Sequence, residues 1–96
     1  MINMADNQYL CKKTSIKNTR GLHARASAKF VEQVNKFNSD IFVSNKNEKV
    51  SGKSIMGLLS LGATQGSDIY IYASGSDAKL AIKHLIKLVD EKFGEE

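Results

Sequence analysis

The sequence contains no proline and no tryptophan, a single cysteine, and no long run of apolar residues. One thiol, that of Cys11, cannot form an internal disulfide or a metal-binding thiol pair, and we interpret it as an inert, buried residue of a strand. No apolar run approaches the roughly 20 residues of a membrane-spanning helix, so we expect no membrane association. Residues 1–8 are polar and acid-containing, unlike a secretory signal, and we expect a cytoplasmic protein.

The chain of 96 residues is long enough for one compact domain and too short for a divided core. We predict a flexible segment at residues 1–8, followed by a single domain at residues 9–96. A domain of this size has little room for a deep, water-excluding cavity, which favours a carrier or binding protein over an enzyme. The net charge of +4 fits a nucleic-acid partner or an acidic protein partner, but the lysines and arginines form no dense cluster.

Hydrophobic periodicity and turn residues predict the order of strands and helices. The predicted elements are a strand at 10–17, a helix at 24–36, strands at 40–44 and 49–51, a short helix at 54–62, a strand at 68–74 and a helix at 78–93. The strands are half polar and the helices are apolar on one side. This pattern predicts an α+β fold, an open-faced β-sandwich in which a four-stranded antiparallel sheet carries three helices on one face.

The same periodicity predicts which side chains enter the core. In the first strand they are Leu10, Thr14 and Ile16. In the first helix the predicted buried face consists of Ala24, Ala28, Val31 and Val34. The short helix has more apolar residues than one buried face needs, and an exposed apolar patch usually indicates docking.

The most informative stretch is Gly21-Leu22-His23-Ala24-Arg25, where a loop becomes the first helix. Gly21 permits a backbone angle or a close approach that a side chain would block. The first amides of the helix lack internal acceptors and form an anion site with the helix dipole, to which Arg25 adds a planar charge. A neutral imidazole of His23 could therefore attack phosphorus here, although these residues alone leave open a plain helix cap.

Two longer blocks carry a family resemblance. RGLHARASAKF at residues 20–30 and KSIMGLLSLG at residues 53–62 resemble HPr, the histidine-containing phosphocarrier family of the bacterial phosphotransferase system. The likeness extends from Leu10 to Phe93 and implies the same open-faced sandwich. It also implies phosphorylation of His23 on Nδ1, with Arg25 beside it. Enzyme I is the implied donor, an enzyme IIA-type protein is the implied acceptor, and no cofactor or metal ion is implied. The residues expected to stabilise the phosphate are Gly21, Ala24 and Arg25.

Ser54 matches the regulatory serine of this family, which implies an HPr kinase/phosphorylase as a further partner. From the residues alone, a plain N-cap is an equal alternative for Ser54. A phosphate there would add charge beside an apolar docking surface. The residues predicted to bind partners are Leu22, Ala24, Ile55, Met56 and Leu59, of which the last three could equally be core.

One position departs from the family motif. The usual motif reads GLHARP, whereas this chain has Ala26 in place of the proline. Alanine is an excellent helix former, so we expect the first turn and the activity to survive without the preset backbone angle. The motif GLHARAS at residues 21–27 resembles that of the branch of the family that serves a nitrogen-related regulatory phosphorelay.

The alternative function is a small RNA-binding module that uses Tyr70 and Tyr72 on an open sheet face. No aromatic and glycine run typical of such modules is present, and the basic residues do not follow the strands. His84 has no Cys, Asp or His at ligand spacing, so we interpret it as a surface residue. The resemblance therefore favours a phosphocarrier that acts as a monomer, without nucleic acid.

Overall fold

The computed structural model describes residues 9–95, so the predicted segment 1–8 and the last residue lie outside the described residues. The elements are β1 (Leu10–Ser15), α2 (Ala24–Val34), β2 (Asp40–Ser44), β3 (Lys49–Ser51), α3 (Ile55–Ser60), β4 (Asp68–Ser74), α4 (Ala78–Asp90) and the 3-10 helix η1 (Lys92–Gly94). The strands form one sheet in the order β1-β4-β2-β3, and every neighbouring pair is antiparallel.

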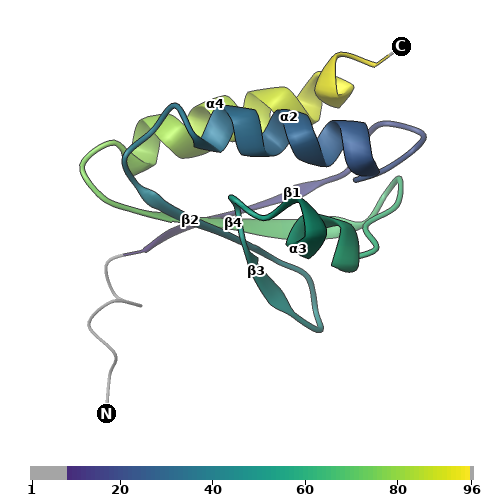
Figure 1. Ribbon diagram of the computed structural model, residues 1–96, viewed down its shortest axis with the longest axis horizontal. Helices are drawn as coiled ribbons and strands as arrows, with labels where there is room; N and C mark the ends of the chain where they lie inside the picture. Colours follow the sequence, from purple (N-terminus) through teal and green to yellow (C-terminus); the bar gives the residue numbers. More distant parts are fainter. Residues whose placement is uncertain (1–8, 96) are drawn as a thin grey trace.

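Helices α2 and α4 lie side by side over one face of the sheet, as Figure 1 shows. Helix α3 contacts α2 and β3. The predicted α+β open-faced sandwich is therefore confirmed. The core between the layers is anchored by Phe30 from α2, Ile71 from β4 and Leu85 from α4, each with no exposed surface. No helix within residues 9–95 has both the length and the apolar character needed to cross a membrane.

The predicted strands at 40–44, 49–51 and 68–74 have the observed boundaries. The other elements are shorter than predicted. Strand β1 ends at Ser15, and helix α2 ends at Val34. Helix α4 stops at Asp90 rather than Phe93, because the backbone turns left-handed at Lys92, with φ of 59°.

Half of the predicted buried face of α2 is confirmed, because Val34 is fully buried and Val31 is partly buried against the core. The other half is wrong. Ala24 and Ala28 are exposed, whereas Ala26, Ser27, Phe30 and Val34 are buried. Phe30 decides the orientation of the helix, because its ring is by far the largest apolar surface that α2 can remove from water.

The inward face predicted for the strand at 10–17 is also only partly as predicted, with Thr14 half-buried. Ile16 is buried, but Leu10 is 45% exposed, because it pairs with Ala73 at the open end of an edge strand. Cys11 belongs to the strand, as predicted, but it is exposed rather than buried. Alternation along an edge strand gives the side on which a residue lies, but it does not give how far the helices extend over that side.

Candidate functional site

The loop before α2 is fixed by a close backbone approach. Gly21 has φ of +69°, and a Cβ atom built there would lie 2.4 Å from the carbonyl oxygen of Ala63. The backbone N–H of Leu22 donates to the same oxygen at 3.0 Å, and the Leu22 side chain is only 4% exposed. Both reasons given above for a glycine, the angle and the close approach, are therefore present. They anchor the chain immediately before His23.

His23 is the N-cap residue of α2, with an extended backbone, and its carbonyl oxygen accepts from the N–H of Ser27 at 2.9 Å. Its side chain makes no capping hydrogen bond, so the ring is not used as a plain cap. Among residues 9–95, the backbone N–H groups of Ala24 and Arg25 have no hydrogen-bond acceptor. The open end of the helix, with its positive dipole, thus adjoins the imidazole.

Arg25 is exposed, and its guanidinium makes no hydrogen bond or ion pair with any described residue. A planar cation that is free of protein partners can turn toward an incoming anion without breaking an existing contact. The predicted pair therefore occupies the N-cap and the second residue of α2, and the guanidinium has no partner among the described residues.

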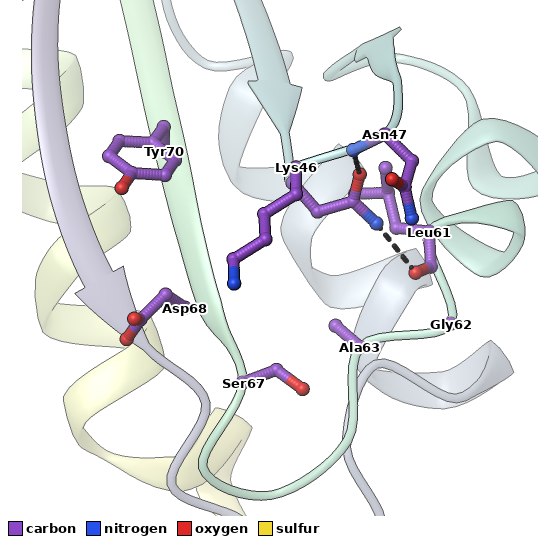
Figure 2. Close-up of a pocket in the computed structure, with 9 residues that line it drawn as sticks. Lys46, Asn47, Leu61, Gly62, Ala63, Ser67, Asp68 and Tyr70 are labelled. Carbon is purple, nitrogen blue, oxygen red and sulfur yellow. Dashed lines mark hydrogen bonds between the residues drawn. The ribbon is translucent and has the colours of Figure 1, made fainter.

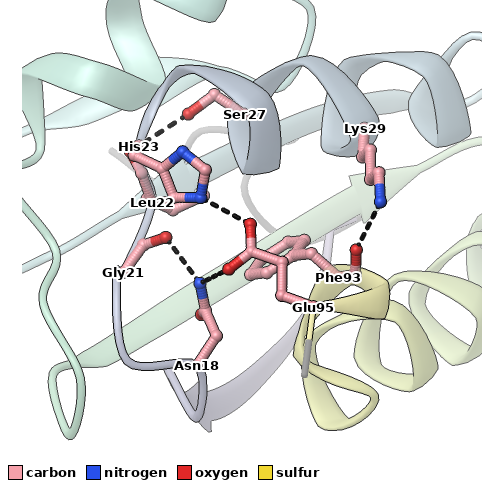
Figure 3. Close-up of polar contacts among 8 residues, drawn as sticks. All are labelled: Asn18, Gly21, Leu22, His23, Ser27, Lys29, Phe93 and Glu95. Carbon is pink, nitrogen blue, oxygen red and sulfur yellow. Dashed lines mark hydrogen bonds and ion pairs between the residues drawn. The ribbon is translucent and has the colours of Figure 1, made fainter.

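A carboxylate from the other end of the chain holds the ring of His23. Figure 3 shows Glu95 reaching across from the C-terminal segment, with its Oε2 atom 2.5 Å from Nε2 of His23. Nδ2 of Asn18 donates to the other carboxylate oxygen at 2.9 Å and to the carbonyl oxygen of Gly21 at 2.8 Å. The side chains of His23 and Glu95 are only 18% and 14% exposed, respectively. The contact is thus largely sheltered from water.

The C-terminal segment reaches this position through an unusual backbone. Lys92 and Phe93 both have positive φ, 59° and 57°, although neither is a glycine. Such a conformation costs on the order of 1–3 kcal/mol per residue and persists only where the surrounding contacts offset that cost. Here the ring of Phe93 is fully buried, and the ammonium of Lys29 donates to the Phe93 carbonyl oxygen at 2.7 Å. These two contacts hold the turn that carries Glu95 to His23.

The surroundings lower the pKa of the Glu95 carboxyl group. Burial acts in the opposite direction and is the largest single influence, because it disfavours the charged form. The hydrogen bonds from Asn18 and His23, together with the charge of Arg20 and the charge that His23 carries when protonated, outweigh it, so that the pKa lies below its ordinary value. Glu95 is therefore a carboxylate at neutral pH and can only accept a hydrogen bond.

Asn18 and Glu95 are site residues that the sequence analysis did not identify. Asn18 follows the strand predicted at 10–17, and Glu95 follows the helix predicted at 78–93, so both lie outside the motif around His23. The side chain of Leu22 is only 4% exposed and packs in the core, so it offers little surface for the predicted partner contact. Gly21 is also buried, and both its backbone N–H and its carbonyl oxygen bond to Asn18. These bonds, together with its positive φ, show that Gly21 shapes the loop before His23, and its role in stabilising a phosphate stays a prediction.

Helix α3 begins at Ser54, whose Oγ accepts a hydrogen bond from the N–H of Gly57 at 2.8 Å. Ser54 is therefore the N-cap of α3 and is half-buried. Beside it, Ile55 is 39% exposed and Met56 is 75% exposed. Leu59 is half-buried, and Leu58 is the residue of this helix that enters the core. The excess of apolar residues in this helix does lie on the surface.

A cleft of about 410 Å³ lies beside Tyr70 at one end of the sheet, where the turn between β2 and β3 faces the start of β4. Figure 2 shows Lys46 extending into it between Tyr70 and Asp68. Tyr72, on the same strand, has the ammonium of Lys49 4.5 Å from its ring centroid, and its hydroxyl hydrogen-bonds to Ser44 at 3.0 Å. A base stacked on Tyr72 would have to displace this lysine. The two tyrosines therefore do not form an open stacking platform.

No group of three or more His, Cys, Asp or Glu side chains within residues 9–95 is arranged to hold a metal ion. The ring of His84 stacks at 5.6 Å from that of Phe37 on the surface. Its position agrees with the interpretation of His84 as a surface residue.

Fold and site together define a class: a small α+β open-faced sandwich with an imidazole at the start of a helix. A family model described as the PTS HPr component phosphorylation site matches residues 10–91. The phosphocarrier protein HPr of Neisseria meningitidis is 41% identical over 86 residues, which cover 90% of this chain and 97% of that protein. The HPr-like protein Crh of Bacillus subtilis is 38% identical and covers 84% of this chain and 95% of its own length.

Solved structures agree with these sequence matches. The crystal structure of HPr-C-His from Thermoanaerobacter tengcongensis has a TM-score of 0.86 and 48% identity, covering 91% of this chain and 98% of that one. The HPr of Bacillus anthracis has a TM-score of 0.81 and 40% identity, covering 84% and 96%. The chain belongs to the HPr family, the phosphocarrier proteins of the phosphotransferase system.

Proposed function

We propose that this protein accepts a phosphoryl group from enzyme I on Nδ1 of His23 and passes it to an enzyme IIA-type protein. The observation that carries the proposal is the position of the ring. Its Nε2 atom is occupied by Glu95, while Nδ1 is turned toward the first turn of α2 (Figure 3). The unpaired amides of Ala24 and Arg25 begin at that turn. They could hold a phosphoryl dianion on Nδ1.

The hold on the phosphoryl group has to be moderate in a carrier. Each charge-assisted hydrogen bond from an amide or from Arg25 contributes about 1.5–3 kcal/mol. Two or three such bonds retain the group between encounters, yet an acceptor with a comparable site can take it. The protein forms and loses a phosphohistidine only together with partner phosphotransferases, so we assign it as a carrier and not as an enzyme.

The partners are proposed to dock on the surface that adjoins the start of α2. Ile55 and Met56 expose apolar side chains at the start of α3, and α3 packs against α2. Ala24 is exposed at the first turn, and Leu59 is half-buried beside the patch. An exposed apolar patch next to a reactive group fits a docking surface better than it fits an unfinished core.

We propose a single carrier domain that works as a monomer in the cytoplasm. His23, Arg25 and Glu95 all come from one chain, so a second copy is not needed to complete the site. The string GLHARAS supports assignment to the nitrogen-related branch of the family. A nucleic-acid partner is not part of the proposal, because Lys49 covers Tyr72 and the basic residues form no stripe along the sheet.

Ser54 is proposed as the regulatory phosphorylation site, with an HPr kinase/phosphorylase as its partner. Its Oγ lies at the N-cap of α3, immediately before the exposed Ile55 and Met56. A phosphate on Oγ would bring about two negative charges to the edge of this apolar patch. Docking of enzyme I would then require burial of those charges, which weakens the complex.

The experiment for the carrier function uses the purified full chain, enzyme I and phosphoenolpyruvate. We expect an acid-labile phosphoryl group on the wild type and none on His23→Ala. His84→Ala is the matched control, because His84 is the only other histidine and is exposed on α4. A wild type without label, or equal labelling of His23→Ala, would refute the proposal.

The experiment for Ser54 replaces the donor with ATP and an HPr kinase. We expect acid-stable label on the wild type and none on Ser54→Ala. Ser60→Ala is the control, because Ser60 is an exposed serine of the same helix. If Ser54→Ala is labelled to the same extent as wild type, the assignment is wrong.

A further inference from the structure

The contact between Glu95 and His23 goes beyond what the motif around His23 explains. Glu95, the last described residue, contacts Nε2 of His23, which is the ring nitrogen that the proposed reaction does not use. From this geometry we propose that Glu95 is a positioning residue, which keeps the proton of His23 on Nε2 and so directs the ring's lone pair to Nδ1. The inference rests on the proposed function and deepens it.

The tautomer follows from the chemistry of the two groups. A carboxylate has only acceptor oxygens, so a contact of 2.5 Å with Nε2 requires the ring nitrogen to donate its proton. In a neutral imidazole one nitrogen carries the proton and the other carries the lone pair. With Nε2 protonated, Nδ1 is the nucleophile, and Figure 3 shows it on the side of the open helix end.

The carboxylate is itself held in place. Asn18, which has no exposed surface, donates to its second oxygen at 2.9 Å and to the Gly21 carbonyl oxygen at 2.8 Å. Asn18 therefore connects Glu95 to the loop that carries His23. A surface carboxylate without such a partner would sample many rotamers, whereas this one has both oxygens engaged.

The backbone before Glu95 supports a built contact rather than a fortuitous one. Two consecutive non-glycine residues, Lys92 and Phe93, adopt positive φ, a conformation that persists only where the surroundings impose it. The burial of Phe93 and the hydrogen bond from Lys29 to its carbonyl oxygen provide that constraint. A straight continuation of α4 would carry Glu95 in another direction.

During transfer the lone pair of Nδ1 forms a bond to phosphorus, and the bond from phosphorus to the donor's leaving atom breaks with its electron pair staying on the donor. The imidazole then carries a positive charge, while its proton remains on Nε2. The carboxylate of Glu95 stabilises this charge by the same hydrogen bond. Transfer to the acceptor reverses these steps, so no proton has to enter or leave the ring.

The test uses the full chain with ¹⁵N-labelled histidine, as wild type, Glu95→Ala and the control Glu91→Ala. Glu91 is an exposed glutamate four residues earlier, at the end of α4. We expect the wild type and the control to show a proton on Nε2 of His23 that exchanges slowly with water and resonates far downfield. Glu95→Ala should lose this signal, and its ring should become a mixture of tautomers.

The same three proteins are then phosphorylated with enzyme I. We expect Glu95→Ala to be slowed about tenfold in the transfer step, at saturating enzyme I, which is the lower end of the loss found when the partner that orients a metal-bound histidine is removed. A protected Nε2 proton and a wild-type rate in Glu95→Ala would overturn the inference. If no variant is phosphorylated, the carrier function fails, while the spectra still decide whether Glu95 sets the tautomer.

Discussion

Oε2 of Glu95 and Nε2 of His23 lie 2.5 Å apart, although 72 positions of the sequence separate them. The ring of His23, at the start of α2, is therefore held by a residue that follows the last helix. Any change that releases the C-terminal turn, such as loss of the buried Phe93 ring, should free the ring of His23 without touching the motif around it. Site geometry and the packing of the last residues are thus coupled in this protein.

Replacing Gly21 by alanine should destabilise the protein strongly. The new Cβ would lie 2.4 Å from the Ala63 carbonyl oxygen, and φ of +69° already disfavours a side chain. We expect the angle to cost about 1–2 kcal/mol and the forced shift of backbone a further 1–3 kcal/mol or so. Gly62→Ala is the control, because φ is +61° there with nothing within 4 Å of the new atom. Urea unfolding should give the smaller loss for Gly62→Ala; equal losses would contradict the steric argument.

The two sides of the site differ in how far the sequence predicts them. The loop from Gly21 to Arg25 could be predicted, because a glycine, an imidazole and a helix start adjoin one another along the chain. Glu95 could not be predicted from local patterns. Its position depends on positive φ at Lys92 and Phe93, which ordinary propensities disfavour and which only burial of the Phe93 ring imposes.

The buried face of α2 shows a second limit of prediction from the sequence. Spacing correctly placed a helix after His23, but it favoured small residues such as Ala24 and Ala28 for the interior. In the folded protein, burial of the large Phe30 ring sets the rotation of α2 about its axis. Ala24 therefore lies on the surface. Periodicity predicts that a face exists, whereas the volume of the side chains decides which face is buried.

Replacing Ala26 by proline, the residue usual in this family, should leave the fold intact. Ala26 lies in the first turn of α2, where the N–H has no intrahelical acceptor to lose. We expect the free energy of unfolding to stay within about 1 kcal/mol of wild type, since proline also restricts the unfolded chain. The phosphorylation of His23 by enzyme I should persist.

The control for this substitution is Ala28→Pro, two residues further along the same helix. Ala28 is exposed, so packing is not at issue, but proline there removes an interior hydrogen bond and clashes with the preceding turn. We expect a loss of about 3 kcal/mol or more in urea unfolding. Equal effects of the two prolines would mean that Ala26 is not in a tolerant first turn.

Asp77 should contribute stability that depends on pH. The hydroxyl of Ser39 and the backbone N–H of Asn38 donate to its carboxylate, and these hydrogen bonds lower the pKa of Asp77 below its ordinary value of 3.8. The folded protein then binds this proton less tightly than the unfolded chain does. The stabilisation is fully present above the unfolded pKa and is lost as the pH falls through the lower folded pKa.

The measurement compares thermal unfolding of wild type and Asp77→Asn at several pH values. We expect the variant to be less stable at pH values well above 3.8 and the gap to narrow at pH values below 3.8. Asp40→Asn serves as the control, because its exposed carboxylate makes no hydrogen bond with any described residue. A gap for Asp77→Asn that is unchanged in acid would show that its carboxylate acts through shape rather than charge.

Placing a charge on the exposed patch of α3 should weaken docking without unfolding the protein. Met56 is 75% exposed, so Met56→Asp removes little packing, and we expect stability to change by less than about 0.5 kcal/mol. Burial of the new carboxylate against enzyme I should cost about 1–2 kcal/mol of binding, measured by calorimetry, and should raise the KM for phosphorylation. Leu80→Asp makes the same change on α4, at a leucine that is 50% exposed, and should leave binding unchanged. If both variants bind enzyme I as the wild type does, the partner does not cover Met56, and Ser54 would need another route by which its phosphate could act.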